Sequence, residues 1–147
     1  DLTTTLSESV VLNGSVRGST NTLTTTGINN VYERIVTCTH SQATTLVAFN
    51  TNSYGAVVQL DKEDVRYIRI TNLNATISVE IAVVGAATLY QITLKAGQSH
   101  ILGAADNIML AEADTTPSYG TMAALQNISV TPIGTTNVDL EVFVASV

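Results

Sequence analysis

SVEIAVVG, residues 78–85, is the stretch that decides the fold class, because it alternates large apolar residues with small or polar ones. A period of two places Val79, Ile81 and Val83 on one face of an extended strand. Glu80 then lies on the opposite face. One face would contact a core while the other contacts solvent, as in a half-buried strand of an antiparallel sheet. The stretch therefore predicts a β-strand within a layered all-β structure.

The same alternation recurs along the chain. NVDLEVFV, residues 137–144, places four apolar residues on one face and Asp139 and Glu141 on the other. Turn-forming residues such as Asn13 and Gly14 separate the alternating runs at the intervals that sandwiches and barrels show. Further strands are expected at residues 9–12, 22–26, 31–39, 44–49, 56–60, 65–71, 88–94, 99–102, 107–110 and 127–131.

The spacing of these runs predicts a single all-β domain over residues 1–147. We expect about eight to ten strands in an antiparallel β-sandwich with jelly-roll-like connections. The composition agrees with this fold class, because the chain holds 23 Thr, 11 Ser and 11 Asn. Threonine suits the pleated surface of a sheet, and Asn and Ser suit turns.

Charge and hydropathy narrow the classes of partner. The formal net charge is −6, and the six Lys and Arg form no cluster. Nucleic-acid binding is therefore not expected, since a cationic surface is needed to displace counterions from phosphates. No apolar run of about 18 residues is present, and DLTTTLSESV lacks the segments of a signal peptide, so we expect neither a membrane span nor a secretion signal.

Two segments are candidate contact surfaces. The first residues, about 1–8, predict an extended arm that becomes ordered against a neighbouring protein, with a frayed terminus as the alternative. AEADTTPSYGTMAALQ, residues 111–126, lacks strand periodicity and predicts a long loop, a kind of segment that often carries function. The candidate subunit contacts are Leu2, Leu6, Thr115, Pro117 and Tyr119.

Residues that could carry catalysis or bind a metal are few. His40 and His100 are the only histidines, and their separation matches no metal-binding motif, so neither a metal nor a cofactor is expected. Cys38 lies two positions before His40, which on an extended strand would bring thiol and imidazole to one face. A free cysteine is more often a small buried apolar residue. No catalytic residue is therefore predicted.

Two other classes of function stay open as alternatives. An enzyme would bring Cys38, His40 or His100 beside an acid in a pocket. A receptor-binding or carbohydrate-binding module would gather exposed tyrosines in a groove. The tyrosines concerned are Tyr32, Tyr54, Tyr67, Tyr90 and Tyr119.

LYQITLKAGQSHIL, residues 89–102, predicts a β-hairpin that holds one of the two histidines. Gly97 would supply the positive φ that a type II turn requires at its third position. The expected register pairs Leu94 with Ser99. The core face would then hold Tyr90, Ile92, Leu94 and Ile101, and the outer face Gln91, Thr93 and His100.

Residues 65–102, together with NVDLEVFV, resemble small all-β structural proteins of tailed bacteriophages. The likeness rests on IRITN, residues 68–72, a strand that ends in asparagine, and on LKAGQS, residues 94–99, a turn between strands. It covers about half of the chain, and the N-terminal third does not match. The resemblance implies a non-enzymatic virion component: a decoration or cement protein on the capsid, or a neck or tail component.

We therefore expect a structural protein of the virion, assembled in the host cytoplasm. Its partners would be major capsid or neck and tail subunits, together with further copies of itself in a symmetric oligomer such as a trimer. Added interface area would hold neighbouring subunits together. A surface rich in Thr, Ser and Asn suits such packing, because short side chains lose little rotamer entropy on contact.

Overall fold

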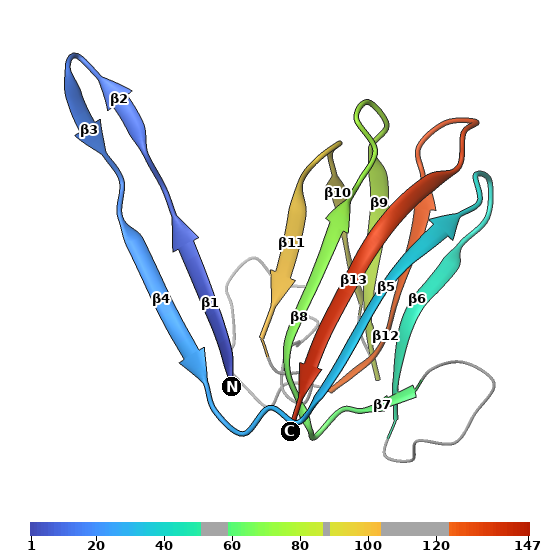
Figure 1. Ribbon diagram of the computed structural model, residues 1–147. Coiled ribbons are helices and arrows are strands. Elements are labelled where there is room, and N and C mark those ends of the chain that lie inside the picture. The colour runs from blue at the N-terminus through green and yellow to red at the C-terminus, as the bar shows by residue number, and fades with distance from the viewer. Residues whose placement is uncertain (51–58, 87–88, 104–123) are drawn as a thin grey trace, which may run out of the picture.

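The computed structural model describes residues 1–50, 59–86, 89–103 and 124–147 (Figure 1). Within these ranges the chain forms thirteen strands and no helix. Nine strands make a two-layered body, and the other four form a separate N-terminal ribbon. The all-β class and the packing of two sheets, both expected from the sequence, are confirmed.

One layer of the body is a five-stranded sheet in the order β10-β9-β12-β6-β7. All neighbours in it pair antiparallel except β6 and β7, which are parallel. The sheet is therefore mixed rather than wholly antiparallel. Its strands are β6 (Thr44–Asn50), β7 (Gln59–Asp61), β9 (Val79–Gly85), β10 (Leu89–Leu94) and β12 (Leu125–Pro132).

The second layer is a four-stranded antiparallel sheet in the order β11-β8-β13-β5. Several strand boundaries agree with the alternation in the sequence to within a residue or two. Its strands are β5 (Asn30–Cys38), β8 (Val65–Asn72), β11 (Ser99–Leu102) and β13 (Val138–Ser146).

The core lies between the two sheets and is built by the predicted alternation. Val79, Ile81 and Val83 of β9 are fully buried, whereas Glu80 is exposed. The apolar face of β13 is buried in the same way, while Asp139 on its other face is exposed. The buried face of each sheet covers that of the other, which removes both from water and stabilises the sandwich.

Asn72 is a fully buried polar residue at the end of β8. Its amide nitrogen donates to the carbonyl oxygens of Ile77 (2.9 Å) and Leu94 (3.3 Å), and its Oδ1 accepts from the backbone N–H of Asn74 (3.0 Å). Its backbone carbonyl accepts from the N–H of Gly97 at 3.1 Å. One side chain thus joins the end of β8 to the end of β10 in the opposite sheet.

The hairpin predicted for residues 89–102 is wrong. Leu94 pairs with Val79 of β9, while Ser99 pairs with Thr71 of β8, so β10 and β11 lie in different sheets. The turn between them has the predicted positive φ at Gly97, +72°, but it carries the chain from one layer to the other. The partner strands β9 and β8 are longer than β10 and β11 themselves. The hydrogen bonds of Asn72 hold the turn where it crosses between the layers.

This crossing also reverses the predicted faces of β11. Ile101, expected in the core, is 49% exposed, whereas Leu102 is buried. His100, expected on the outer face, is partly buried and faces Tyr90 of the other sheet. The interior of the sandwich lies on the opposite side of β11 from where a hairpin would have placed it.

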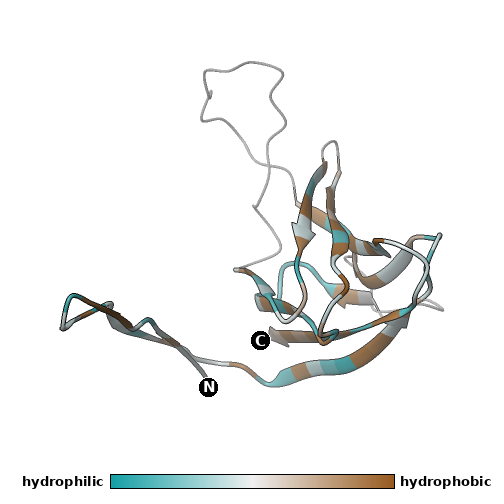
Figure 2. Ribbon diagram, turned by 90° about the horizontal axis from the view of Figure 1, so that it is seen from above, coloured by the Kyte–Doolittle hydropathy of each residue, from teal (hydrophilic) through white to brown (hydrophobic). Residues whose placement is uncertain are grey.

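The first residues, expected as an extended arm, are one strand of a long β-ribbon. β1 (Leu2–Ser7) pairs with β4 (Thr20–Thr25), and β2 (Val10–Leu12) pairs with β3 (Ser15–Arg17). The Glu8 N–H donates to the Ser19 carbonyl at 2.9 Å between the two pairs, which makes the hairpin continuous. Figures 1 and 2 show this ribbon leaving the body as a separate projection.

The ribbon is closed by a two-residue turn that the sequence pattern anticipates. Asn13 and Gly14 both have positive φ, 51° and 79°, as a type I′ hairpin turn requires. Asparagine and glycine adopt this conformation at little cost. The turn therefore sets the register of the ribbon from its tip.

Other sequence expectations fall at the edges of the described ranges. Leu125 and Gln126, expected in the long loop, belong to β12. The charged segment DKED, residues 61–64, is the end of β7 and the turn that leads to β8. The expected strand at residues 107–110 lies outside the described residues.

Candidate interaction surface

The N-terminal ribbon has two chemically different faces. Residues opposite each other in an antiparallel pair project to the same side. Leu6 lies opposite Asn21, and Val10 opposite Arg17, in one register, so alternate residues share a face along the whole ribbon. We call this side the leucine face; it is formed by Leu2, Thr4, Leu6, Val10, Leu12, Arg17 and Leu23, together with the polar residues between them.

The opposite side, the threonine face, consists mainly of short hydroxyl side chains. Thr5 and Thr22 lie across from each other with their Oγ1 atoms 3.3 Å apart, and Ser7 and Thr20 with their hydroxyls 2.9 Å apart. Its members are Thr3, Thr5, Ser7, Thr20, Thr22 and Thr24, with Val11 and Val16 near the tip.

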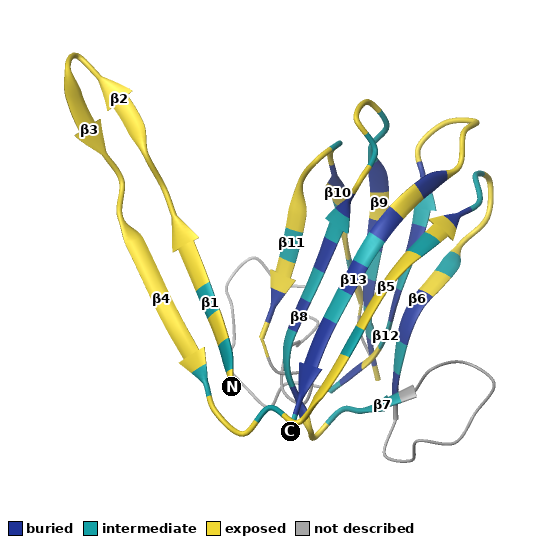
Figure 3. Ribbon diagram, viewed as in Figure 1, coloured by how far each residue is buried: buried dark blue, intermediate teal, exposed yellow. Residues whose placement is uncertain are grey.

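Most residues of the ribbon, including those of the leucine face, are exposed (Figure 3). Leu6 is 57% exposed and Leu23 is 65% exposed; Val10 and Leu12 are exposed as well. A two-stranded ribbon without a core is marginally stable in water, and an exposed apolar surface on it marks an interaction site. The ribbon is therefore a candidate interaction surface.

The base of the ribbon lies beside the body. Leu2, Thr4 and their strand neighbours line a hollow with Tyr67, Arg69 and Phe143 on the outer face of the four-stranded sheet. Leu2 and Thr4 are half-buried there, so the leucine face turns toward the sheet at its base. We call Tyr67, Arg69 and Phe143 the ribbon seat.

The ribbon seat is held rigidly by contacts among its own residues. The Arg69 guanidinium donates to Glu141 at 2.7 Å and lies over the Phe143 ring, 5.7 Å from its centroid. Tyr67 packs edge-on against the same ring, with centroids 6.0 Å apart. Ordered aromatic and guanidinium groups give a contact surface that has little conformational entropy to lose.

Further apolar side chains lie around the ribbon seat on the same outer face. Ile101 is opposite Arg69, and Phe143 is opposite Glu33. Ile35, one row further along β5, is 67% exposed, and Val31 is exposed too. This outer sheet face thus combines Val31, Ile35 and Ile101, all uncovered, with the aromatic ribbon seat.

The predicted contact residues fall in different places. Leu2 lies at the base of the ribbon and lines the hollow beside the ribbon seat, and Leu6 lies exposed on the leucine face. The sequence analysis selected residues from this segment but missed that it continues to Thr25 as a ribbon. The Asn13-Gly14 turn, with leucines spaced by even numbers on either side of it, was the pattern that could have revealed this. Thr115, Pro117 and Tyr119 lie outside the described residues.

Cys38 and His40 do not form a catalytic pair. β5 ends at Cys38, whose thiol is fully buried in the core and donates to the Val36 carbonyl at 3.7 Å. His40 lies in the following turn, with Nδ1 3.0 Å from Oδ1 of Asn137. Burial, with the nearby charge of Asp139, raises the pKa of the Cys38 thiol from 9.0 to about 11. A buried thiol of raised pKa is a core residue and not a nucleophile.

Cys38 is therefore expected to react slowly with a thiol reagent in the native protein. At pH 8 the raised pKa lowers the thiolate fraction about 100-fold relative to an ordinary cysteine, and burial slows the reaction further. The rate of modification by Ellman's reagent, compared in buffer and in guanidinium chloride, measures this. Equal rates in the two solvents would contradict the core assignment.

His100 and Tyr90 link the edge strands of the two sheets. The tyrosine hydroxyl lies 3.0 Å from Nε2 of His100, and the rings meet edge to face with centroids 6.1 Å apart. Burial lowers the pKa of His100 and raises the pKa of Tyr90, which favours the neutral form of both side chains. The pair closes this side of the sandwich with a neutral hydrogen bond.

His100 is expected to make the protein less stable in acid. Because burial lowers its pKa below 6.5, the unfolded chain binds the proton more readily than the folded one, so stability falls as the pH drops below 6.5. His100→Gln keeps a polar group beside Tyr90 and should flatten this part of the profile. Urea unfolding between about pH 7.5 and about pH 5 measures the change; an identical decline in the variant would count against it.

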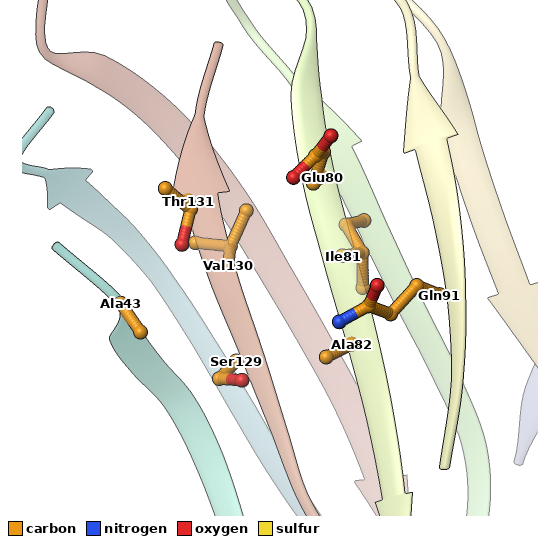
Figure 4. A pocket seen from close by; sticks show the side chains of 8 residues that line it. All are labelled: Ala43, Glu80, Ile81, Ala82, Gln91, Ser129, Val130 and Thr131. Carbon is orange, nitrogen blue, oxygen red and sulfur yellow. The ribbon is translucent and has the colours of Figure 1, made fainter. Parts of the chain in front are cut away.

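A shallow hollow on the outer face of the five-stranded sheet is shown in Figure 4. Ala82 leaves space between Gln91 of β10 and Ser129 of β12, and Glu80 and Thr131 lie at one end. Glu80 is the only ionisable residue among those that line it. The hollow offers hydrogen-bonding groups but no nucleophile paired with a base.

The described tyrosines do not form one groove. Tyr32 and Tyr90 pack against the core, whereas Tyr67 lies on the outer sheet face. Tyr54 and Tyr119 lie outside the described residues. Among the residues that the structure covers, no group of three or more His, Cys, Asp or Glu side chains could hold a metal ion.

The same ranges contain no helix long and apolar enough to cross a membrane. Comparison with known proteins found no family model that matches the chain and no curated protein similar to it.

Proposed function

We propose that this chain is a non-enzymatic structural protein of a virus particle, most specifically a capsid decoration or cement protein that binds neighbouring subunits. The observation that carries the proposal is the projecting ribbon, whose leucine face has exposed Leu6, Val10, Leu12 and Leu23 and no core of its own. Such a ribbon is costly to leave in water and gains stability when another protein covers it.

The order of the strands in the body supports a jelly-roll fold. We number the eight strands of the body other than β7 in chain order. The four-stranded sheet then contains the first, third, sixth and eighth of them, which are β5, β8, β11 and β13. The other sheet contains the second, fourth, fifth and seventh, β6, β9, β10 and β12, with β7 added at its edge. This division of eight strands between two sheets is typical of a jelly roll, in which two Greek keys form a double sheet. Viral capsid domains and lectins share this architecture.

The composition of the ribbon favours a role in assembly rather than a role in sugar binding. Its threonine face presents short hydroxyl side chains that lose little entropy on packing. The tyrosines that the structure describes are divided between the core and one outer face, so they offer no aromatic platform for a glycan. The body would anchor the chain in the particle, and the ribbon would reach an adjacent subunit.

Binding to particles tests the proposal. Purified chain is mixed with virus particles that lack it and sedimented. We expect the wild type to sediment with the particles and Leu12→Glu, on the leucine face, to bind at least about tenfold more weakly, because a charge would be buried. Thr22→Glu adds the same charge to the threonine face of the same ribbon and serves as the matched control.

Either of two results would contradict the proposal. One is a wild-type chain that neither sediments with particles nor is detected in purified virions by mass spectrometry. The other is turnover of a small-molecule substrate by the purified chain that is lost on substitution of Glu80 or Ser129, the polar residues of the hollow in Figure 4.

A further inference from the structure

We infer that the leucine face of the ribbon docks on the outer sheet face of a second copy of this chain, so that neighbouring copies are clasped by their ribbons. The inference rests on the proposed function, which requires contact with neighbouring subunits. It identifies the neighbouring subunit as a second copy of this chain. Both halves of the contact are present in one chain: an uncovered leucine face and an uncovered apolar sheet face.

The base of the ribbon already lies beside this sheet face. Leu2, Thr3, Thr4 and Thr5 line one hollow together with Tyr67, Arg69 and Phe143 within one chain. A second ribbon approaching along the same sheet would extend this arrangement to neighbouring apolar residues. Its leucines would cover Val31, Ile35 and Ile101, which no part of the described chain covers.

The ribbon of the same chain does not make this contact. Beyond Thr4 the leucine face is exposed, with Leu6 at 57% and Leu23 at 65%. Ile35 on the sheet is 67% exposed at the same time. Figure 2 shows the ribbon extending away from the body and not across the sheet. The uncovered parts of both surfaces are therefore available to another copy.

The charges on the two surfaces favour one end of the contact. Arg17 lies on the leucine face, and no acidic partner for it is found in the described parts of the chain. Glu8, across from Ser19, lies on the same face between Leu6 and Val10. The outer sheet face carries Glu33 and Asp139 in addition to the Glu141 that pairs with Arg69. Arg17 of the arriving ribbon would be attracted by these acids, whereas Glu8 would have to lie away from them.

The contact area is that of a small interface. From Thr5 to Leu12 each strand of the ribbon is about 27 Å long, and the two strands together are about 10 Å wide. Two copies that exchange ribbons would bury about 1,100 Å² in total, near the lower limit for a specific interface. An interface of this size is typical of a weak or transient association, so the oligomeric state should depend on protein concentration.

The test is the oligomeric state of the intact chain and of two matched variants. Light scattering after size-exclusion chromatography, from about 1 to about 200 µM, should show the wild type associating. Leu6→Glu should raise the dissociation constant at least about 30-fold, since it places a charge in the apolar contact. Thr5→Glu, its neighbour on the threonine face, should associate as the wild type does.

Mixing two defective variants shows whether the contact is between copies. Ile35→Glu damages the sheet face and Leu6→Glu damages the ribbon, so each alone should be monomeric. A mixture retains one intact ribbon on the first chain and one intact sheet face on the second. It regains one of the two contacts, so it should associate more strongly than either variant alone and more weakly than the wild type. Circular dichroism of each variant establishes that it is folded.

The outcomes separate this inference from the proposed function. A wild type that stays monomeric at about 200 µM but sediments with particles would overturn the second-copy inference alone. A wild type that associates equally well with Leu6→Glu and Thr5→Glu would overturn it too, because the leucine face would then not be used. Association through the ribbon without any particle binding would support the inference and count against the virion role.

Discussion

Replacing Ile81 with alanine is expected to lower the free energy of unfolding by about 3–4 kcal/mol, since it leaves a cavity in a close-packed core. Ile81 is fully buried at the centre of β9, which is paired on both sides, by β10 and β12. The surrounding strands are held in register by their own ladders and cannot collapse fully into the space. Urea unfolding followed by circular dichroism measures the loss.

The adjacent residue provides the matched control. Glu80→Ala alters the next position of the same strand, but Glu80 is exposed on the outer face. A change of less than about 0.5 kcal/mol is expected there. Equal losses at Ile81 and Glu80 would mean that β9 does not have one buried and one solvent-facing side, which would contradict the sandwich.

Replacing Asn72 with alanine is expected to cost about 3 kcal/mol for a different reason. The amide of Asn72 donates to the carbonyls of Ile77 and Leu94, and its oxygen accepts from Asn74. Alanine would leave these groups without their partner inside the protein, and each unsatisfied buried group costs about 1–3 kcal/mol. The loss should appear as a lower midpoint of urea unfolding at an unchanged slope.

Asn30→Ala is the control for this substitution. Asn30 begins β5 and its side chain is exposed. A change within about 0.5 kcal/mol is expected. If Asn72→Ala were as mild as Asn30→Ala, the side chain could not be what holds the turn at residues 95–98 between the two sheets.

Alternation in the sequence predicted most strands of the body correctly, because a half-buried strand requires it. The inward faces of β9 and β13 follow directly from SVEIAVVG and NVDLEVFV. Burial of Cys38 also agrees with the usual preference of a free cysteine. In each case burial follows from the type of the residue and its position in its own strand, and both can be read from the sequence.

The candidate interaction surface was predicted only in part. Leu2 and Leu6 were selected from the N-terminal segment, but their partners Thr25 and Asn21 lie across the ribbon and were not connected with them. The ribbon seat could not be predicted at all. Tyr67, Arg69 and Phe143 come from two strands that are far apart in the sequence and meet only through the pairing of β8 with β13.

The sequence by itself determined that this chain forms short strands with one apolar side, which pack as two layers. The tertiary structure alone decided which strands pair. LYQITLKAGQSHIL has the alternation and the glycine turn of a hairpin, yet β10 joins β9 and β11 joins β8. The physical reason is that period two establishes the two sides of a strand but not its neighbour. The neighbour depends on non-local contacts, here the pairing with β8 and β9 and the buried hydrogen bonds of Asn72.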